Sequence, residues 1–167
     1  MYIKRFLIVS YIVSFILVVG WLYKDKLDWI KLGNDDEEIL FELFIPCIKL
    51  KSFVYNMDSV YNDVDRNTEI LSGSEFGYNL FYLASHSGGG KASYFDNLVC
   101  LEKGDLIWLM GRGSGYIFVV EDIYYIEKNG YFVVDNNKIE NTLFLITCSL
   151  RYVNKQLVVK SNLIYIF

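Results

Sequence analysis

The sequence has a single histidine, a single proline and three cysteines among its 167 residues. With one histidine and no Cys-x-x-Cys pair, it has no ligand set typical of zinc, and we predict neither a metal nor another cofactor. The cysteines, Cys47, Cys100 and Cys148, are odd in number, so at least one has no partner within the chain. A disulfide scaffold is therefore not expected, although a Cys47–Cys100 bridge stays open as an alternative in an oxidising compartment.

Positive charge is also scarce. The formal net charge is −4, from 16 Lys and Arg against 20 Asp and Glu. Residues 1–23 carry a charge of +2, from Lys4 and Arg5. Since the whole chain carries −4, the remaining residues carry −6. An acidic domain without a basic stripe argues against nucleic acid as a partner. The abundant residues, 14 Tyr and 12 Phe with many Ile and Val, favour β-structure.

One long apolar run stands near the start of the chain. Residues 6–23 (FLIVSYIVSFILVVGWLY) hold 18 positions without a charge, the lower end of what spans a bilayer as a helix. Trp21 and Tyr23 suit the membrane interface and no small-x-small cleavage site follows, which favours a signal anchor over a cleaved signal peptide. We predict a cytoplasmic tail at residues 1–5, one span of the cell membrane, and an extracellular domain.

A charged linker and a β-rich domain are predicted after the span. Residues 24–42 are interpreted as a juxtamembrane linker, whose acidic run 35–38 is solvated or, alternatively, binds calcium. In residues 43–167, short apolar runs between turn residues favour a closed or nearly closed antiparallel barrel. Residues 57–71 predict a short helix or turn, with Asp58 as an N-cap. The expected strands are 43–50, 52–57, 79–85, 106–110, 116–126, 131–134, 142–148 and 156–167.

The segment LASHSGGGK, residues 83–91, holds the only histidine beside three glycines and a lysine. A phosphate-binding loop requires G-x-x-x-x-G-K-[ST] ahead of a helix. Here Ser85 stands at the first glycine position, Ala92 follows the lysine, and no long amphipathic helix comes after it. We therefore exclude a phosphate loop. The glycines of GRGSG, residues 111–115, lie between two strand-like runs and predict a hairpin turn.

His86 and Cys148 each follow a strand-like run, LFYLAS and TLFLIT. Most lone histidines and cysteines are packing or surface residues. Both of these, however, are expected at strand ends on the rim of the barrel, within reach of a substrate. A thiol beside an imidazole supplies a nucleophile and a general acid. Arg151, three residues beyond the cysteine, is available to stabilise an oxyanion.

The order of several short motifs then resembles one known family. Residues 45–50 have the pattern I-P-x-I-x-L, and H-x-G follows an apolar strand in LASHSG. Residues 94–105 have the pattern YFDNL-x-x-L-x-x-GD, and L-x-T-C at residues 145–148 precedes a final strand of alternating Val and Ile. With the N-terminal apolar run, this pattern resembles the sortases, membrane-anchored cysteine transpeptidases of Gram-positive bacteria, over most of residues 43–167.

The resemblance implies an eight-stranded β-barrel with short helices that binds a sorting peptide of the LPxTG type. Cys148 would attack the Thr–Gly carbonyl to form a thioacyl intermediate, and His86 would act as general acid and base. An amine of a peptidoglycan precursor or of a pilin would resolve the intermediate. Thr147 and Ser87 would lie at the substrate site. The short loop between the last two strands and the N-terminal anchor favour a class B- or D-like member over a pilin polymerase with a lid and a C-terminal anchor.

One residue of the family does not align. The family arginine, which binds substrate and stabilises the oxyanion, stands at the start of the last strand, where this chain has Gln156. We predict that Arg151 takes this role, with Gln156 as a neutral alternative. Phe144 replaces a signature threonine, and its alternation with Ile146 and Cys148 predicts packing. Two alternatives stay open, namely a sortase-like barrel that only binds peptides and a structural β-domain without an enzymatic role.

Overall fold

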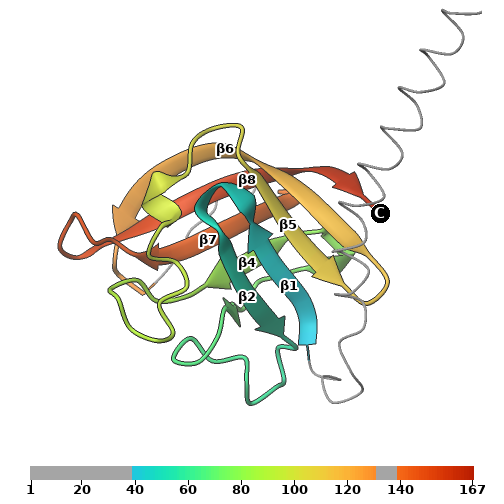
Figure 1. Cartoon of the computed structure of the whole chain (residues 1–167), viewed down its shortest axis with the longest axis horizontal. Helices are drawn as coiled ribbons and strands as arrows, with labels where there is room; N and C mark the ends of the chain where they lie inside the picture. The colour runs from blue at the N-terminus through green and yellow to red at the C-terminus, as the bar shows by residue number, and fades with distance from the viewer. Residues whose placement is uncertain (1–38, 131–138) are drawn as a thin grey trace, which may run out of the picture. The chain divides into compact units, whose positions relative to one another are not determined.

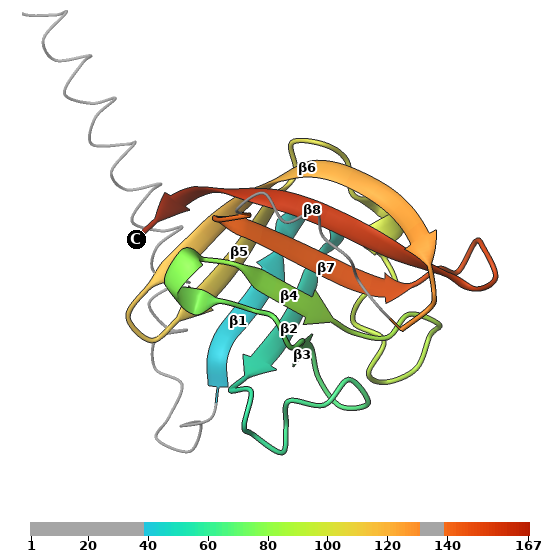
Figure 2. The same ribbon diagram turned by 180° about the vertical axis from the view of Figure 1, so that it is seen from behind.

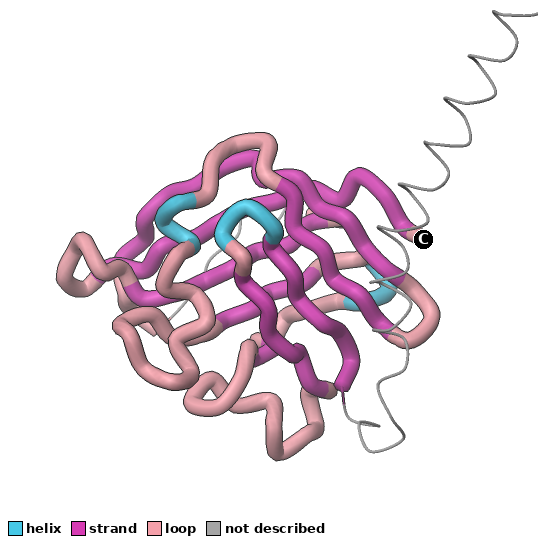
Figure 3. The backbone as a smooth tube through the Cα atoms, viewed as in Figure 1, coloured by secondary structure: helices cyan, strands magenta, loops and turns pink. Residues whose placement is uncertain are grey.

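A computed structural model describes residues 39–130 and 139–167, which form an all-β barrel (Figure 1). The predicted fold class is confirmed. Over these residues the chain forms one sheet of eight strands with three short 3-10 helices (Figure 3). The strands are β1 (Ile39–Ile45), β2 (Leu50–Tyr55), β3 (Glu69–Ile70), β4 (Phe81–Ala84), β5 (Leu106–Gly111), β6 (Gly115–Glu127), β7 (Thr142–Cys148) and β8 (Lys155–Ile166); the 3-10 helices are η1 (Pro46–Ile48), η2 (Phe76–Tyr78) and η3 (Leu98–Cys100).

The strand order brings the two edges of the sheet together. The order is β2-β1-β5-β6-β8-β7-β4-β3, and β4 pairs with β7 in parallel while the other neighbours are antiparallel (Figure 2). At the edges, Val54 of β2 forms a bridge with Thr68, directly before β3. The Ser52 and Thr68 hydroxyls are hydrogen-bonded at 2.7 Å in a buried position. The sheet is therefore nearly closed, which leaves few unpaired edge groups.

Two apolar clusters lie on opposite sides of β7. The larger cluster fills the barrel and includes Leu143 and Leu145. The smaller lies on the outer face and includes Phe144 and Ile146, with the Phe144 ring stacked on Tyr82 at 5.1 Å between centroids. Because successive side chains of a strand point to opposite faces, burial of both faces explains why β7 is an almost continuous apolar run. The predicted packing role of Phe144 is confirmed.

The first predicted strand, residues 43–50, is divided by Pro46. Proline has no N–H for the ladder, so β1 ends at Ile45 and η1 begins at Pro46. Lys49 then adopts a left-handed conformation, φ 53°, and its N–H bonds to the Pro46 carbonyl before β2 starts. β1 also begins at Ile39, so residues 39–42, which we assigned to the linker, are part of the barrel.

Turns, not a helix, occupy most of residues 57–71. Side-chain bonds to the backbone hold this segment: the Asp63 carboxylate accepts from the Asp65 N–H at 2.9 Å. The Asn62 side chain both accepts from the Ile70 N–H, at 2.7 Å, and donates to its carbonyl, at 3.2 Å. Such local bonds compete with helix formation. The turn alternative is confirmed, and Asp58 caps no helix.

Several other expectations have a clear outcome. The hairpin over residues 111–115 is confirmed, because β5 and β6 pair antiparallel on either side of it. All three cysteines are free, so the Cys47–Cys100 bridge is not formed. Several predicted features lie outside the described residues. They are the cytoplasmic tail, the membrane span, most of the linker with its acidic run, and the strand at residues 131–134. Within residues 39–130 and 139–167, no helix is long and apolar enough to cross a bilayer.

Candidate active site

The parallel pairing of β4 and β7 brings His86 and Cys148 to the same end of two neighbouring strands. Ala84, the last residue of β4, pairs with Ile146 in this register. His86 stands two positions beyond Ala84, just past the end of β4, and Cys148 stands two positions beyond Ile146, as the last residue of β7. Adjacent strands run about 4.8 Å apart, and residues two positions apart face the same side. The two residues therefore extend from the same end of neighbouring strands and on the same face. The histidine side chain is 44% exposed, and the cysteine is half-buried.

Two hydroxyls tie the ends of these strands together. The Ser87 hydroxyl donates to the Cys148 carbonyl at 2.6 Å, and the buried Thr147 hydroxyl donates to the Ser85 carbonyl at 2.8 Å. Each bond joins the β4 end of the chain to the β7 end. Ser87 and Thr147 therefore position the cysteine and histidine through backbone contacts, and their role toward substrate stays a prediction.

Thr147→Val is expected to lower the free energy of unfolding. The valine has the same shape without the hydroxyl, so the buried Ser85 carbonyl loses its donor, at a cost of about 1–3 kcal/mol. Thr147→Ser is the matched control, because it keeps the hydroxyl. Urea unfolding followed by circular dichroism measures both variants. Equal stability of the valine variant and the parent protein would contradict the structural role of this bond.

His86 is held by a carboxylate that the sequence did not single out. Its Nε2 lies 2.8 Å from the Asp65 Oδ1, in the turn segment before β3. An ionised carboxylate only accepts hydrogen bonds, so Nε2 carries the proton of this bond and Nδ1 is the other ring nitrogen. Asp65 is 79% exposed, so the pair orients the ring with only a small gain in stability. The 21 residues between the two leave no local pattern that would have identified Asp65.

The glycines after His86 bind a carboxylate of this chain. Gly88 N–H donates to the Asp96 Oδ1 at 2.6 Å, and Gly89 N–H lies 3.2 Å from its Oδ2. Both glycines have positive φ, 128° and 78°, which an L side chain rarely adopts. The loop is thus a turn closed on Asp96, consistent with the exclusion of a phosphate loop.

Gln156 stands directly opposite Cys148 in the antiparallel pairing of β7 and β8. Residues directly opposite each other share a face, so the glutamine lies beside the cysteine on the side away from His86. Ile126 of β6 pairs with Gln156 in turn. Four positions therefore form a row across neighbouring strands: Ile126, Gln156, Cys148 and the position of His86. Gln156, the residue that stands where the family has its arginine, lies within this row.

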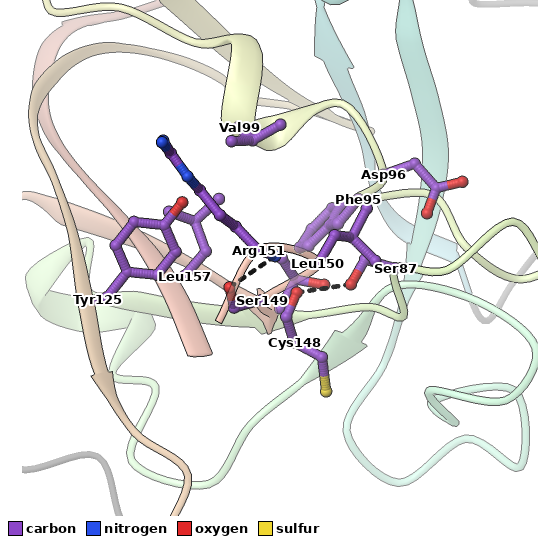
Figure 4. A pocket seen from close by; sticks show the side chains of 11 residues that line it. Ser87, Phe95, Asp96, Val99, Tyr125, Cys148, Ser149, Leu150, Arg151 and Leu157 are labelled. Atoms are coloured by element: carbon purple, nitrogen blue, oxygen red, sulfur yellow. Dashed lines mark hydrogen bonds between the residues drawn. The ribbon is translucent and has the colours of Figure 1, made fainter. Parts of the chain in front are cut away.

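Arg151 lies in the β7–β8 loop, in a different position. Its guanidinium lies 5.6 Å from the centroid of the Tyr152 ring, which packs edge-on against Tyr125 at 4.8 Å. In Figure 4 the arginine side chain and the Cys148 sulfur point in opposite directions. The structure therefore brings Gln156, rather than Arg151, beside the thiol.

An apolar pocket of about 270 Å³ lies against the backbone of Cys148, on the side of Arg151 (Figure 4). Its volume suits one or two amino-acid side chains rather than a larger ligand. The pocket is built from the end of β7, the β7–β8 loop and the segment around η3. Its lining residues are Ser87, Phe95, Asp96, Val99, Tyr125, Thr147, Cys148, Ser149, Leu150, Arg151 and Leu157.

A second residue that the sequence did not indicate, Lys128, contacts the thiol. Its Nζ lies 3.4 Å from the Cys148 Sγ. Lys128 follows the last residue of β6, and its N–H donates to the Asn154 carbonyl at 2.8 Å, which extends the β6–β8 pairing by one step. It stands two residues beyond Ile126 and so on the same face as Gln156 and Cys148.

These features define an eight-stranded barrel with a half-buried thiol and an imidazole on the ends of two adjacent parallel strands. The family model described as "Sortase domain" matches residues 43–164. The chain belongs to the sortase family. Sortase A of Bacillus anthracis is 26% identical over 144 residues, which are 84% of this chain and 68% of that protein.

Solved sortases share the fold. Sortase C of Streptococcus pneumoniae superposes with a TM-score of 0.66 at 24% identity, over 77% of this chain and 70% of that one. A lid mutant of sortase A from Corynebacterium diphtheriae superposes with a TM-score of 0.65 at 22% identity, over 83% and 78%. These relatives are sortases A and C, whereas the sequence favoured a class B- or D-like member, and the subclass stays a prediction.

Proposed function

We propose that this protein is a cysteine transpeptidase that cleaves an LPxTG-like sorting signal and transfers the cleaved protein to an amine. Membership of the sortase family supports the reaction class. The observation that carries the proposal is the register of β4 and β7, which puts Cys148 and His86 at the same end of adjacent strands. A nucleophile and a proton-transfer group then reach one substrate carbonyl from the same face.

The proposed reaction has two transfers at one carbonyl carbon. The Cys148 sulfur attacks the Thr–Gly carbonyl, forming a C–S bond, while the C–N bond of the peptide breaks. His86 takes the thiol proton and donates it to the departing glycine amine. The acceptor amine then attacks the thioester, forming a new C–N bond and releasing the sulfur, and its proton returns through His86. Asp65 orients the imidazole by holding Nε2, so Nδ1 is the nitrogen that exchanges the proton.

For the third role we propose Gln156 in place of Arg151, because Gln156 is paired with Cys148 and shares its face. Its amide N–H would donate to the oxyanion that forms at the carbonyl oxygen. A neutral amide gives a weaker bond than a guanidinium, so slower catalysis than with an arginine is expected. Arg151, on the pocket side, would instead contact the peptide.

Gln156→Ala is expected to lower kcat/KM by about tenfold to a hundredfold, since a preorganised oxyanion donor is lost. Arg151→Ala is the comparison and is expected to raise KM with little change in kcat, because its guanidinium points away from the sulfur. Steady-state cleavage of a fluorogenic sorting peptide measures both. A larger loss of kcat for Arg151→Ala than for Gln156→Ala would restore the assignment that the sequence favoured.

The proposed partners follow from the site and from the apolar N-terminal run. The pocket beside Cys148 is lined largely by apolar side chains and suits an apolar residue of an extended peptide. The acceptor is an amine of a peptidoglycan precursor or of a pilin; the study of the S. pneumoniae sortase C concerns pilin substrate specificity. We further propose that residues 6–23 anchor the protein in the cell membrane, with the barrel outside the cell.

A peptide panel tests the proposal. The full-length chain in mild detergent is incubated with LPxTG-like peptides and with a small amine, and the products are identified by mass spectrometry. We expect cleavage between Thr and Gly, a thioacyl adduct on Cys148 and a peptide–amine product. A second candidate is a catalytically impaired sortase-like barrel that binds peptides, which the neutral Gln156 opposite the cysteine favours. Peptide binding without an adduct or cleavage would identify it.

A further inference from the structure

The outer face around Cys148 carries a positive charge from Lys128, the residue that follows β6. Lys128 Nζ lies 3.4 Å from the Cys148 Sγ, within hydrogen-bond range for a sulfur acceptor. Its backbone is held in place by the bond from its N–H to the Asn154 carbonyl, at 2.8 Å. The lysine therefore starts from a paired strand end on the same face as Cys148, and its side chain extends to the sulfur from there.

The other polar side chains on the face of Cys148 come from two strands. β8 presents Gln156, which is neutral. The β4 end presents His86, whose Nε2 is bonded to the Asp65 carboxylate. Glu127 and Lys155 flank this row but alternate to the opposite face, where they form an ion pair of 3.3 Å with each other. Lys128 thus adds an ammonium to a face whose other ionisable side chain, the His86 imidazole, already has a carboxylate partner.

We propose that Lys128 is a catalytic residue of this site and that its ammonium stabilises the Cys148 thiolate. The residue opposite the cysteine, Gln156, is neutral and cannot supply this charge. An ammonium that donates to a thiolate lowers the free energy of the ionised sulfur, which is the nucleophilic form. As the sulfur attacks a carbonyl, its negative charge passes to the carbonyl oxygen beside it. The same ammonium is then close to the developing charge. Its role in peptide transfer rests on the proposed function, whereas its effect on the thiolate does not.

Alkylation of the thiol tests the effect directly. The background is the full-length chain with Cys47→Ala and Cys100→Ala, so that iodoacetamide reacts with Cys148 alone. Lys128→Gln is expected to slow alkylation at neutral pH by about tenfold, as for the loss of a charge-assisted hydrogen bond. Lys128→Arg keeps the charge and is expected to stay within about twofold of the parent.

The matched control is Lys103→Gln, which removes a lysine paired with Asp122 at 3.3 Å, far along the chain from the site. It is expected to leave the alkylation rate unchanged. An unchanged rate in Lys128→Gln, or an equal loss in Lys103→Gln, would overturn the proposal. Peptide cleavage is measured on the same variants. If Lys128→Gln slows alkylation but neither the parent nor any variant cleaves the peptide, the role of Lys128 is supported and the proposed function is refuted. If the parent cleaves the peptide but Lys128→Gln leaves the alkylation rate unchanged, the proposed function is supported and the role of Lys128 is refuted.

Discussion

Cys148→Ala is expected to abolish cleavage and transfer of a sorting peptide, with a loss in kcat/KM of about a thousandfold or more. The sulfur is the atom that forms the thioacyl bond, and alanine offers no nucleophile in its place. The substitution removes one half-buried atom at a strand end and leaves the backbone bond from the Ser87 hydroxyl to the Cys148 carbonyl intact. Loss of activity would therefore report chemistry rather than unfolding.

The chain supplies its own matched controls for this experiment. Cys47 and Cys100 are also free and are exposed, so Cys47→Ala and Cys100→Ala each remove a thiol away from the site. Partial desolvation, followed by the effects of the neighbouring Asp105 carboxylate, raises the pKa of the Cys47 thiol, which makes it a poorer nucleophile at neutral pH. Both control variants are expected to keep full activity. Cleavage that persists in Cys148→Ala but is lost in Cys47→Ala or Cys100→Ala would reassign the nucleophile.

His86→Gln is expected to lower kcat by about a hundredfold to ten-thousandfold. Glutamine fills a similar volume and still hydrogen-bonds, but it cannot take the thiol proton or protonate the leaving amine. The imidazole is 44% exposed and stands on the strand end next to Cys148, so the variant is expected to fold as the parent does. Single-turnover formation of the thioacyl adduct, followed by mass spectrometry, separates this step from substrate binding.

Asp65→Asn tests how much of the histidine's role depends on orientation. The carboxylate is 79% exposed, and exposed pairs contribute little, so a loss of only about twofold to fivefold is expected. The pH profile of kcat is measured for both variants. A bell-shaped profile that persists in His86→Gln would show that another group transfers the proton. A loss in Asp65→Asn as large as that in His86→Gln would mean that the carboxylate is an integral part of the catalytic group.

Much of the barrel could be predicted from local patterns. Short Val-, Ile- and aromatic-rich runs between turn residues mark strands, and seven of the predicted runs match strands of the structure. The boundaries were less accurate where one residue changes the backbone. Pro46 divides the run at 43–50, because it cannot donate to the ladder, and Lys49 reverses the chain with a left-handed conformation. Closure of the barrel at Thr68 depends on pairings between distant residues, which no local pattern shows.

Part of the candidate site could likewise be predicted from the sequence, and part could not. That His86 and Cys148 follow apolar runs could be seen in the sequence, and so could the absence of an arginine at position 156. The parallel pairing of β4 with β7, which makes the two residues neighbours, is a property of the fold. From the sequence alone, Arg151 is the better candidate for the cationic role, because a loop residue close to the cysteine in sequence is free to approach it.

The sequence by itself determined the β-rich class, the turn positions, and which side chains have the functional groups that could serve as nucleophile and base. These depend on side-chain period, on backbone restriction at Pro and Gly, and on functional-group chemistry, which are local properties. Only the tertiary structure decided that Asp65 holds His86, that Lys128 contacts Cys148, and that Arg151 faces the pocket. Those contacts join residues whose separation along the chain carries no signal, because strand register and loop direction are set by packing of the whole sheet.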